Sequence, residues 1–142
     1  MHDHKPEGPF DGYSDRFLEL ASDTDHAGIP EDYDATGGQT GQCGDTVSFY
    51  LKTNGDTITE ARFAIDGCMN TLACANAVVF LIGGRTIDEA WEVNEHTIAE
   101  ELHGIPEDHF HCAELAAGAL YKALRNLNTV RRDPWKKPYQ KK

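Results

Sequence analysis

The sequence lacks a long hydrophobic run, and its longest uninterrupted apolar stretch is Ala77–Ile82. A helix that crosses a bilayer needs about 20 apolar residues, so the chain has no candidate for a membrane-spanning segment. It also lacks a basic segment followed by an apolar stretch near its N-terminus. A secretory signal has both features, so we expect none here and expect a cytoplasmic protein.

Positive charge is scarce as well. The chain has 13 lysines and arginines against 24 aspartates and glutamates, which gives a formal net charge of −11. Nucleic acids and anionic membranes are bound through cationic surfaces, so we expect neither as a partner. The length of 142 residues, with 39% hydrophobic residues, is ordinary for one domain with its own core.

Only four cysteines are present, and no two of them form a CxxC pair: Cys43, Cys68, Cys74 and Cys112. In a reducing compartment, such thiols are metal ligands, catalytic groups or buried apolar residues more often than disulfides. A metal site would therefore have to be assembled by the fold from distant parts of the chain.

A β-hairpin is predicted in the middle of the sequence. Val47, Phe49 and Leu51 alternate with polar residues, which is the pattern of a half-buried strand, and Asn54-Gly55 follows as a turn. The second strand is expected from Ile58 to Ile65, with a bulge near Glu60 because its apolar residues change parity there. A third strand over residues 33–40 could widen the sheet, although the glycine run at 37–41 contains no strong strand former.

The rest of the domain is predicted to be helical. Ser14 caps a short first helix, and a helix capped by Asn70 or Thr71 continues to Ile82 and stops at Gly83. Capping boxes at Thr86 and Thr97 begin two short helices. The last helix is expected from about Cys112 to Leu127. We therefore predict a flexible segment 1–12, one domain over 13–128 and a basic tail over 129–142.

These elements predict an α+β fold, with a small antiparallel sheet of about three strands and helices packed on one face. In this arrangement Cys43 precedes the first hairpin strand, Cys68 lies between the second strand and a helix, and Cys112 lies in the first turn of the last helix. Helix N-termini stabilise thiolates. We therefore expect the three thiols to meet at an exposed rim as a metal or sulfur site, with Asp45 on the same side as Cys43.

Cys74 is expected to differ from the other three cysteines. It lies in the middle of a helix between Ala73 and Ala75, which favours a role as a small core residue.

The chain resembles a known family, the IscU/NifU-type iron–sulfur cluster assembly scaffolds, which implies a SufE/IscU-like fold. Three segments carry the resemblance, which extends from about Phe17 to Leu127: Cys43-Gly44-Asp45, ARFAIDGC at 61–68 and HCAELA at 111–116. It implies that Cys43, Cys68 and Cys112 hold a transient [2Fe–2S] cluster. It also implies auxiliary ligation by Asp45 or His111, a cysteine desulfurase as the sulfur donor, and apo-proteins as recipients.

The resemblance implies a carrier rather than a turnover enzyme, in which the weak oxygen ligand Asp45 allows release. His111 could act as a ligand, donate a proton or cap the helix. Residues 105–109 (IPEDH) depart from the Leu-Pro-Pro-Val-Lys segment that an Hsp70-type chaperone binds in many members, which counts against that chaperone as a partner. Whether two copies of the chain share the cluster as a homodimer stays open.

Two alternatives also fit these ligand types. One is a zinc-dependent sulfurtransferase of the SufU type, in which Asp45 and the same three cysteines hold Zn²⁺. This chain does not have the insertion between the second and third cysteines that marks those relatives, which counts against it. The other is a purely structural zinc ion, which the sizeable helical core makes unnecessary.

Overall fold

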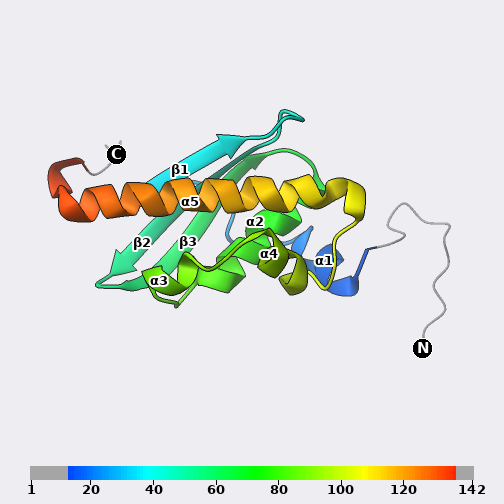
Figure 1. The fold of residues 1–142 in the computed structure, drawn as a ribbon, viewed down its shortest axis with the longest axis horizontal. Helices are drawn as coiled ribbons and strands as arrows, with labels where there is room; N and C mark the ends of the chain where they lie inside the picture. Colours follow the sequence, from blue (N-terminus) through cyan, green and yellow to red (C-terminus); the bar gives the residue numbers. More distant parts are fainter. Residues whose placement is uncertain (1–12, 137–142) are drawn as a thin grey trace.

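The computed structural model describes residues 13–136 and shows a three-stranded antiparallel sheet in the order β1-β2-β3, with helices over one face (Figure 1). The strands are β1 (Ala35–Thr40), β2 (Thr46–Asn54) and β3 (Thr57–Asp66). The helices are α1 (Asp15–Leu20), α2 (Met69–Ile82), α3 (Ile87–Ala90), α4 (Glu95–Glu101) and α5 (Phe110–Arg132), with short 3₁₀ turns η1 (Glu107–His109) and η2 (Pro134–Lys136). The predicted fold class is confirmed.

The hairpin forms as its sequence pattern predicts. Val47, Phe49 and Leu51 of β2 are fully buried, while the residues between them are more exposed. Gly55 occupies the turn with a φ of +64°, a conformation that glycine adopts at little cost. Lys52 lies opposite Glu60 and Thr53 lies opposite Ile58, so Thr59 is an extra residue in β3. The bulge predicted near Glu60 is therefore confirmed.

The glycines of β1 explain how a strand forms where strand-forming residues are scarce. A Cβ atom on Gly37 would lie 2.2 Å from the backbone nitrogen of Ala123 in α5. Only a residue without a side chain lets the helix lie this close to the strand. β1 therefore depends on packing against α5 rather than on local propensity.

Two helix starts differ from the prediction. Cys68, rather than Asn70 or Thr71, is the N-cap of α2, so that helix begins at Met69. Asn94, rather than Thr97, caps α4, and the Thr97 side chain completes the capping box by accepting a hydrogen bond from the Asn94 backbone. Asn and Thr occur both as N-caps and within the first helical turn, so the sequence pattern alone did not fix the residue at which each of these two helices begins.

Helix α5 is longer than predicted at both ends. It begins at Phe110 and reaches Arg132, so residues 129–132 of the predicted tail are helical. Arg131 Nη2 lies 2.7 Å from Asp56 Oδ1 in the hairpin turn, so the two side chains form an ion pair, and Val130 is buried. The predicted flexible segment 1–12 and the end of the predicted tail lie outside the described residues.

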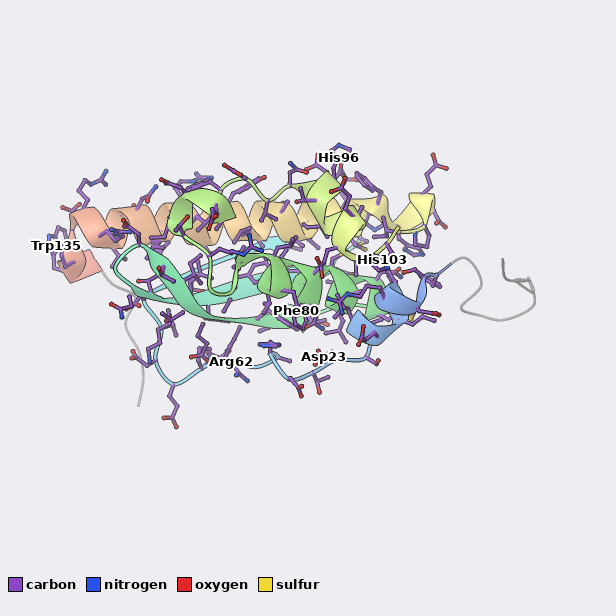
Figure 2. All side chains as sticks on the ribbon, turned by 90° about the horizontal axis from the view of Figure 1, so that it is seen from below. Asp23, Arg62, Phe80, His96, His103 and Trp135 are labelled. Carbon is purple, nitrogen blue, oxygen red and sulfur yellow. The ribbon has the colours of Figure 1, made fainter. Side chains whose placement is uncertain are left out.

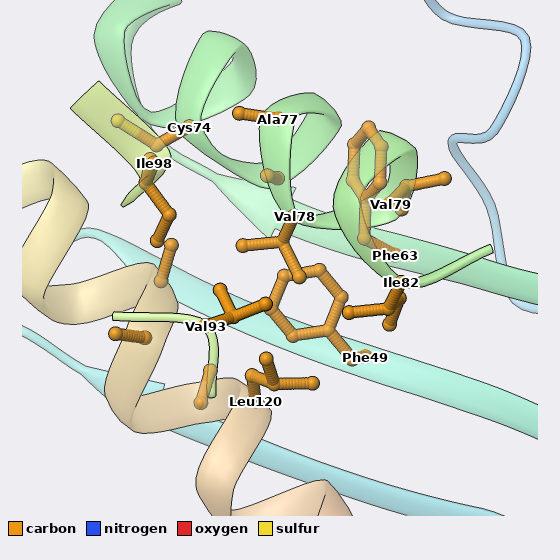
Figure 3. Packing of buried hydrophobic residues seen from close by; sticks show 14 of the residues in the cluster. Phe49, Phe63, Cys74, Ala77, Val78, Val79, Ile82, Val93, Ile98 and Leu120 are labelled. Atoms are coloured by element: carbon orange, nitrogen blue, oxygen red, sulfur yellow. The ribbon is translucent and has the colours of Figure 1, made fainter. Parts of the chain in front are cut away.

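The core lies between the sheet and the helices. Figure 3 shows Phe49 and Phe63 of the sheet with Val78 and Ile82 of α2 and Leu120 of α5, all of which belong to one buried cluster. Cys74 belongs to the same cluster and is fully buried, as predicted. Within the described part of the chain, no helix combines the length and the apolar character needed to cross a membrane.

The sheet face away from α5 carries the segment between α1 and β1. Figure 2 shows this segment passing below the sheet, with Arg62 pointing toward it. The Arg62 guanidinium donates to the Ala27 carbonyl at 3.1 Å, and the Gly28 N–H donates to the Phe63 carbonyl at 2.7 Å. This segment covers part of the second face and one edge of β3, and the helices cover the other face.

Candidate metal site

Three chain segments meet at the end of the molecule where α5 begins: the β1–β2 loop, the junction of β3 with α2, and the first turn of α5 (Figure 1). Here one ligand atom each from Asp45, Cys68 and Cys112 lies within 4.8 Å of the others. In the described residues this is the one group of three or more such side chains close enough to share a metal ion. We call these three residues the triad.

Cys68 is positioned by the start of α2. Its backbone is extended at the N-cap, and its carbonyl accepts the first hydrogen bond of the helix, from the Thr71 N–H at 3.0 Å. The Asn70 side-chain amide lies 3.6 Å from its sulfur. Burial raises the pKa of the Cys68 thiol, but hydrogen bonds from Thr71 and Asn70 lower it more, and the net pKa lies below the ordinary value.

Cys112 has the opposite electrostatic setting. Cys112 is 1% exposed, and this burial raises the pKa of its thiol to about 12. A hydrogen bond from Thr71 opposes the shift, and the nearby Cys68, Asp45 and Cys43 add to it. The expectation that the helix N-terminus would favour a thiolate at Cys112 is therefore wrong for the metal-free protein. Desolvation outweighs the helix dipole because the thiol lies beneath the rim rather than on it.

Asp45 is held by Thr71, which the sequence indicated only as a possible helix cap and not as a site residue. The Thr71 hydroxyl donates to Asp45 Oδ2 at 2.6 Å, and the same oxygen lies 3.9 Å from the Cys68 sulfur. A Cβ atom on Gly67 would lie 2.7 Å from that oxygen, so the missing side chain makes room for the carboxylate. The signal for Thr71 was its position one helical turn after Cys68, on the same face of α2.

Cys43 does not belong to the triad. It is exposed on the β1–β2 loop, where the Gly44 N–H donates to the Gly41 carbonyl at 3.0 Å and Gly44 has a φ of +92°. Cys43 is therefore not part of the group of ligand atoms within 4.8 Å of one another, whose third member is Asp45. Its thiol still lies near enough to Cys112 to add to the rise in the pKa of that thiol, and the role of Cys43 as a ligand stays a prediction.

Cys43 instead lines a neighbouring cavity of about 600 Å³. His111 and Glu114 of α5 and Gln39 of β1 line the same cavity. His111 is exposed, and its Nε2 lies 3.7 Å from the Cys112 sulfur. The cavity thus connects the loop cysteine with the triad through His111.

Cys74 lies below the site and takes no part in it. Burial raises the pKa of its thiol well above the ordinary value, and the charges of Cys112 and Cys68 raise it further. A thiol that is both fully buried and protonated is a poor ligand and a poor nucleophile, so its packing role is enough to explain it.

The donor set of the triad is chemically selective. Two thiols and a carboxylate suit zinc, iron and cobalt, whereas calcium and magnesium prefer sites made of oxygen alone. Binding must displace the proton of Cys112, so it releases protons and depends on pH. The arrangement can therefore hold a thiophilic metal at a position open to the solvent.

Comparison with known sequences places this site in context. The sequence profile of the family described as "NifU-like N terminal domain" matches residues 12–133. The "Nitrogen fixation protein NifU" of Trichormus azollae is 35% identical over 127 residues, which are 83% of this chain and 42% of that protein. The "Iron-sulfur cluster assembly scaffold protein IscU 1" of Archaeoglobus fulgidus is 32% identical over 113 residues, 79% of this chain and 74% of that one. The chain thus spans less than half the length of its NifU relatives.

Solved structures with the same fold are also found. One, from Fervidobacterium islandicum AW-1, is described as an iron–sulfur cluster assembly scaffold protein for the SUF system. It superposes with a TM-score of 0.68 at 22% identity and covers 82% of this chain and 99% of that one. The N-terminal part of a NifU-like protein from Brucella abortus gives a TM-score of 0.52 at 23% identity, over 82% and 83% of the two chains.

Proposed function

The chain belongs to the NifU-like N-terminal domain family, and from this premise we propose that it is a scaffold on which iron–sulfur clusters are assembled. It receives iron and persulfide sulfur, holds a labile [2Fe–2S] cluster as its cargo and passes that cluster to apo-proteins. The sulfur donor is a cysteine desulfurase, and the chain itself is a carrier rather than a turnover enzyme.

The single observation that carries this proposal is the triad, in which Cys68 is exposed at the rim and Cys112 lies beneath it. Cys68 and Cys112 supply two thiol ligands from helix ends, and Asp45 supplies an oxygen within 4.8 Å of both sulfurs. A site with one oxygen ligand and one exposed cysteine binds an iron–sulfur cargo less tightly than four buried cysteines would. Such a site can both accept its cargo and release it.

Cys43 completes the proposed ligand set from the loop. Its thiol is exposed and can supply the additional ligand that a cluster of two irons requires, and Gly41 and Gly44 in the same loop allow the backbone to change its path. His111, with its Nε2 3.7 Å from the Cys112 sulfur, is an auxiliary ligand that takes the place of Asp45 or assists it.

Anaerobic reconstitution tests the proposal. The full chain is incubated with ferrous iron, cysteine, a desulfurase and a dithiol reductant, which supplies the electrons that convert persulfide sulfur to sulfide. The visible absorbance of a [2Fe–2S] cluster is followed together with its transfer to an apo-ferredoxin. We expect one labile cluster in the wild type and none in Cys68→Ala. Cys74→Ala is the matched control, because that thiol is fully buried in the core, and it should leave the cluster yield unchanged.

A wild type that forms no cluster, or a Cys68→Ala variant that forms one normally, would refute the scaffold function. Metal analysis of protein purified without air addresses the second candidate, a zinc-dependent sulfurtransferase. The Asp45, Cys68 and Cys112 donor set supports this candidate too, because zinc accepts the same ligands. Stoichiometric zinc with stimulation of the desulfurase would favour it over the scaffold.

A further inference from the structure

Thr71 is a polar residue enclosed at the centre of the triad. Its side chain is fully buried, yet its hydroxyl has three neighbours that are all site atoms. The oxygen lies 2.6 Å from Asp45 Oδ2 and 3.9 Å from the sulfurs of both Cys68 and Cys112. A hydroxyl has one hydrogen to donate, and at 2.6 Å Asp45 Oδ2 is its main acceptor, while the two sulfurs at 3.9 Å are weaker partners.

Gly67 bounds the same space from the other side. A Cβ atom there would lie 2.7 Å from Asp45 Oδ2, 2.8 Å from Asp45 Cγ and 3.0 Å from Thr71 Oγ1. Real side chains essentially never approach so closely, so any larger residue would displace the carboxylate or the hydroxyl. Gly67 and Thr71 together define a pocket of the right size for one carboxylate group.

We propose that Thr71 is a positioning residue that acts through Asp45: with Gly67 it fixes the carboxylate as a preformed third ligand beside the two sulfurs. This inference rests on the proposed function only in requiring that the triad binds metal. Asp45 follows an exposed, glycine-containing turn, so its side chain would otherwise sample several rotamers. The hydrogen bond from α2 ties this loop residue to the helix that carries Cys68.

The contribution to affinity follows from this geometry. A ligand that is already oriented loses little conformational freedom when the metal arrives. Loss of a hydrogen-bond partner that orients a metal ligand typically lowers metal affinity by about 10–100-fold. We therefore expect Thr71→Val, which keeps the shape and removes the hydroxyl, to weaken binding of a single probe ion by about tenfold.

The test is an anaerobic titration of the full metal-free chain with Co²⁺. Binding is monitored through the sulfur-to-cobalt charge-transfer absorption of the complex. Thr71→Ser keeps the hydroxyl and should bind nearly as well as the wild type. Thr36→Val is the matched control, because it also removes one threonine hydroxyl, which donates to the Phe49 carbonyl at 2.8 Å away from the triad. It should leave the Co²⁺ affinity unchanged.

A double-mutant cycle separates positioning from a general structural effect. If Thr71 acts through Asp45, Thr71→Val should weaken Co²⁺ binding in the wild type and have no further effect in Asp45→Ala. Gly67→Ala should lower the Co²⁺ affinity as well, because its methyl group would displace the carboxylate. This effect too should be seen only while Asp45 is present. Circular dichroism and the melting temperature show whether each variant keeps its fold; if Thr71→Val does not, Gly67→Ala with and without Asp45→Ala carries the same test.

The outcomes are distinguishable. Wild-type affinity in Thr71→Val, or an equal loss with and without Asp45, would overturn the positioning role and leave the scaffold proposal intact. A wild type that binds no Co²⁺ would overturn the metal site itself and this inference with it. Normal Co²⁺ binding with failed cluster reconstitution would remove the scaffold function while the positioning role remained.

Discussion

The two sides of the candidate site are held in place by different means. Cys68 and Cys112 form a helix side, because Cys68 is the N-cap of α2 and Cys112 is buried in the first turn of α5. Cys43 and Asp45 form a loop side, on a turn that contains the positive-φ residue Gly44. The site thus combines two ligands fixed by their helices with a loop that carries two more, of which only Asp45 is held by a contact from a helix.

The hydrogen bond between Thr71 and Asp45 is the link between these sides. It gives the loop side one fixed ligand and leaves Cys43 outside. A single ion would therefore meet Asp45, Cys68 and Cys112, whereas a cluster with two irons would require the loop to bring Cys43 closer. The loop side thus decides which cargo the site can hold.

The largest expected effect concerns thiol reactivity on the helix side. The pKa of Cys68 lies below its ordinary value and that of Cys112 is raised to about 12, so at neutral pH Cys68 has by far the larger thiolate population. In metal-free Cys43→Ala/Cys74→Ala protein, iodoacetamide should modify Cys68 at least about 100-fold faster than Cys112, as peptide mass mapping would measure.

The pH profile shows the cause of this difference. Thiolates form as the pH rises through the pKa, so the rate at Cys68 should level off at a lower pH than the rate at Cys112, which should still be rising at pH 10. Unfolded protein in denaturant is the control, because both thiols should then react alike. A plateau at the same pH for both cysteines in the folded protein would contradict the electrostatic difference.

The next effect compares the two sides directly. Cys68→Ala removes a ligand of the triad and should weaken Co²⁺ binding by more than about 100-fold. Cys43→Ala should change Co²⁺ affinity by less than about threefold, because Cys43 lies outside the triad. The same variant should nevertheless lower the yield of reconstituted cluster several-fold.

This pair of measurements has a clear opposing result. Equal loss of Co²⁺ affinity in Cys43→Ala and Cys68→Ala would show that the loop closes on a single ion and that the two sides do not differ in solution. An unchanged cluster yield in Cys43→Ala would show that the loop cysteine is not needed for the larger cargo.

The sequence predicted most of the helix side and only part of the loop side. Strand alternation at Val47, Phe49 and Leu51 and the apolar helix before Gly83 are local patterns, so the elements and the fold class were predicted correctly. The ends of those elements placed Cys68 and Cys112 at one rim. The pattern could not show that Cys112 is covered, because the burial of a residue in the first turn of a helix depends on tertiary packing.

The path of the β1–β2 loop could not be predicted from the sequence pattern. Glycines permit many backbone conformations, so the position of Cys43 relative to Asp45 could not be derived from their spacing of two residues. The role of Thr71 depends on a contact with a residue 26 positions away in the sequence, which only the fold reveals. The β1 glycines likewise required the position of α5 to be understood.

The smallest expected effect concerns Gly44, in the turn of the loop side. Gly44 has a φ of +92°, and a Cβ atom there would meet nothing within 4 Å, so Gly44→Ala introduces backbone strain without a clash. Such strain costs about 1–2 kcal/mol, which should lower the melting temperature by about 2–8 °C. Because Thr71 holds Asp45 independently of this turn, Co²⁺ affinity should change by less than about threefold. Scanning calorimetry and the Co²⁺ titration measure the two quantities, and Gly55→Ala in the distant hairpin turn, where φ is +64°, is the matched control. A loss of affinity as large as that of Thr71→Val, absent in the control, would mean that the conformation of the turn, rather than the hydrogen bond from α2, places the carboxylate.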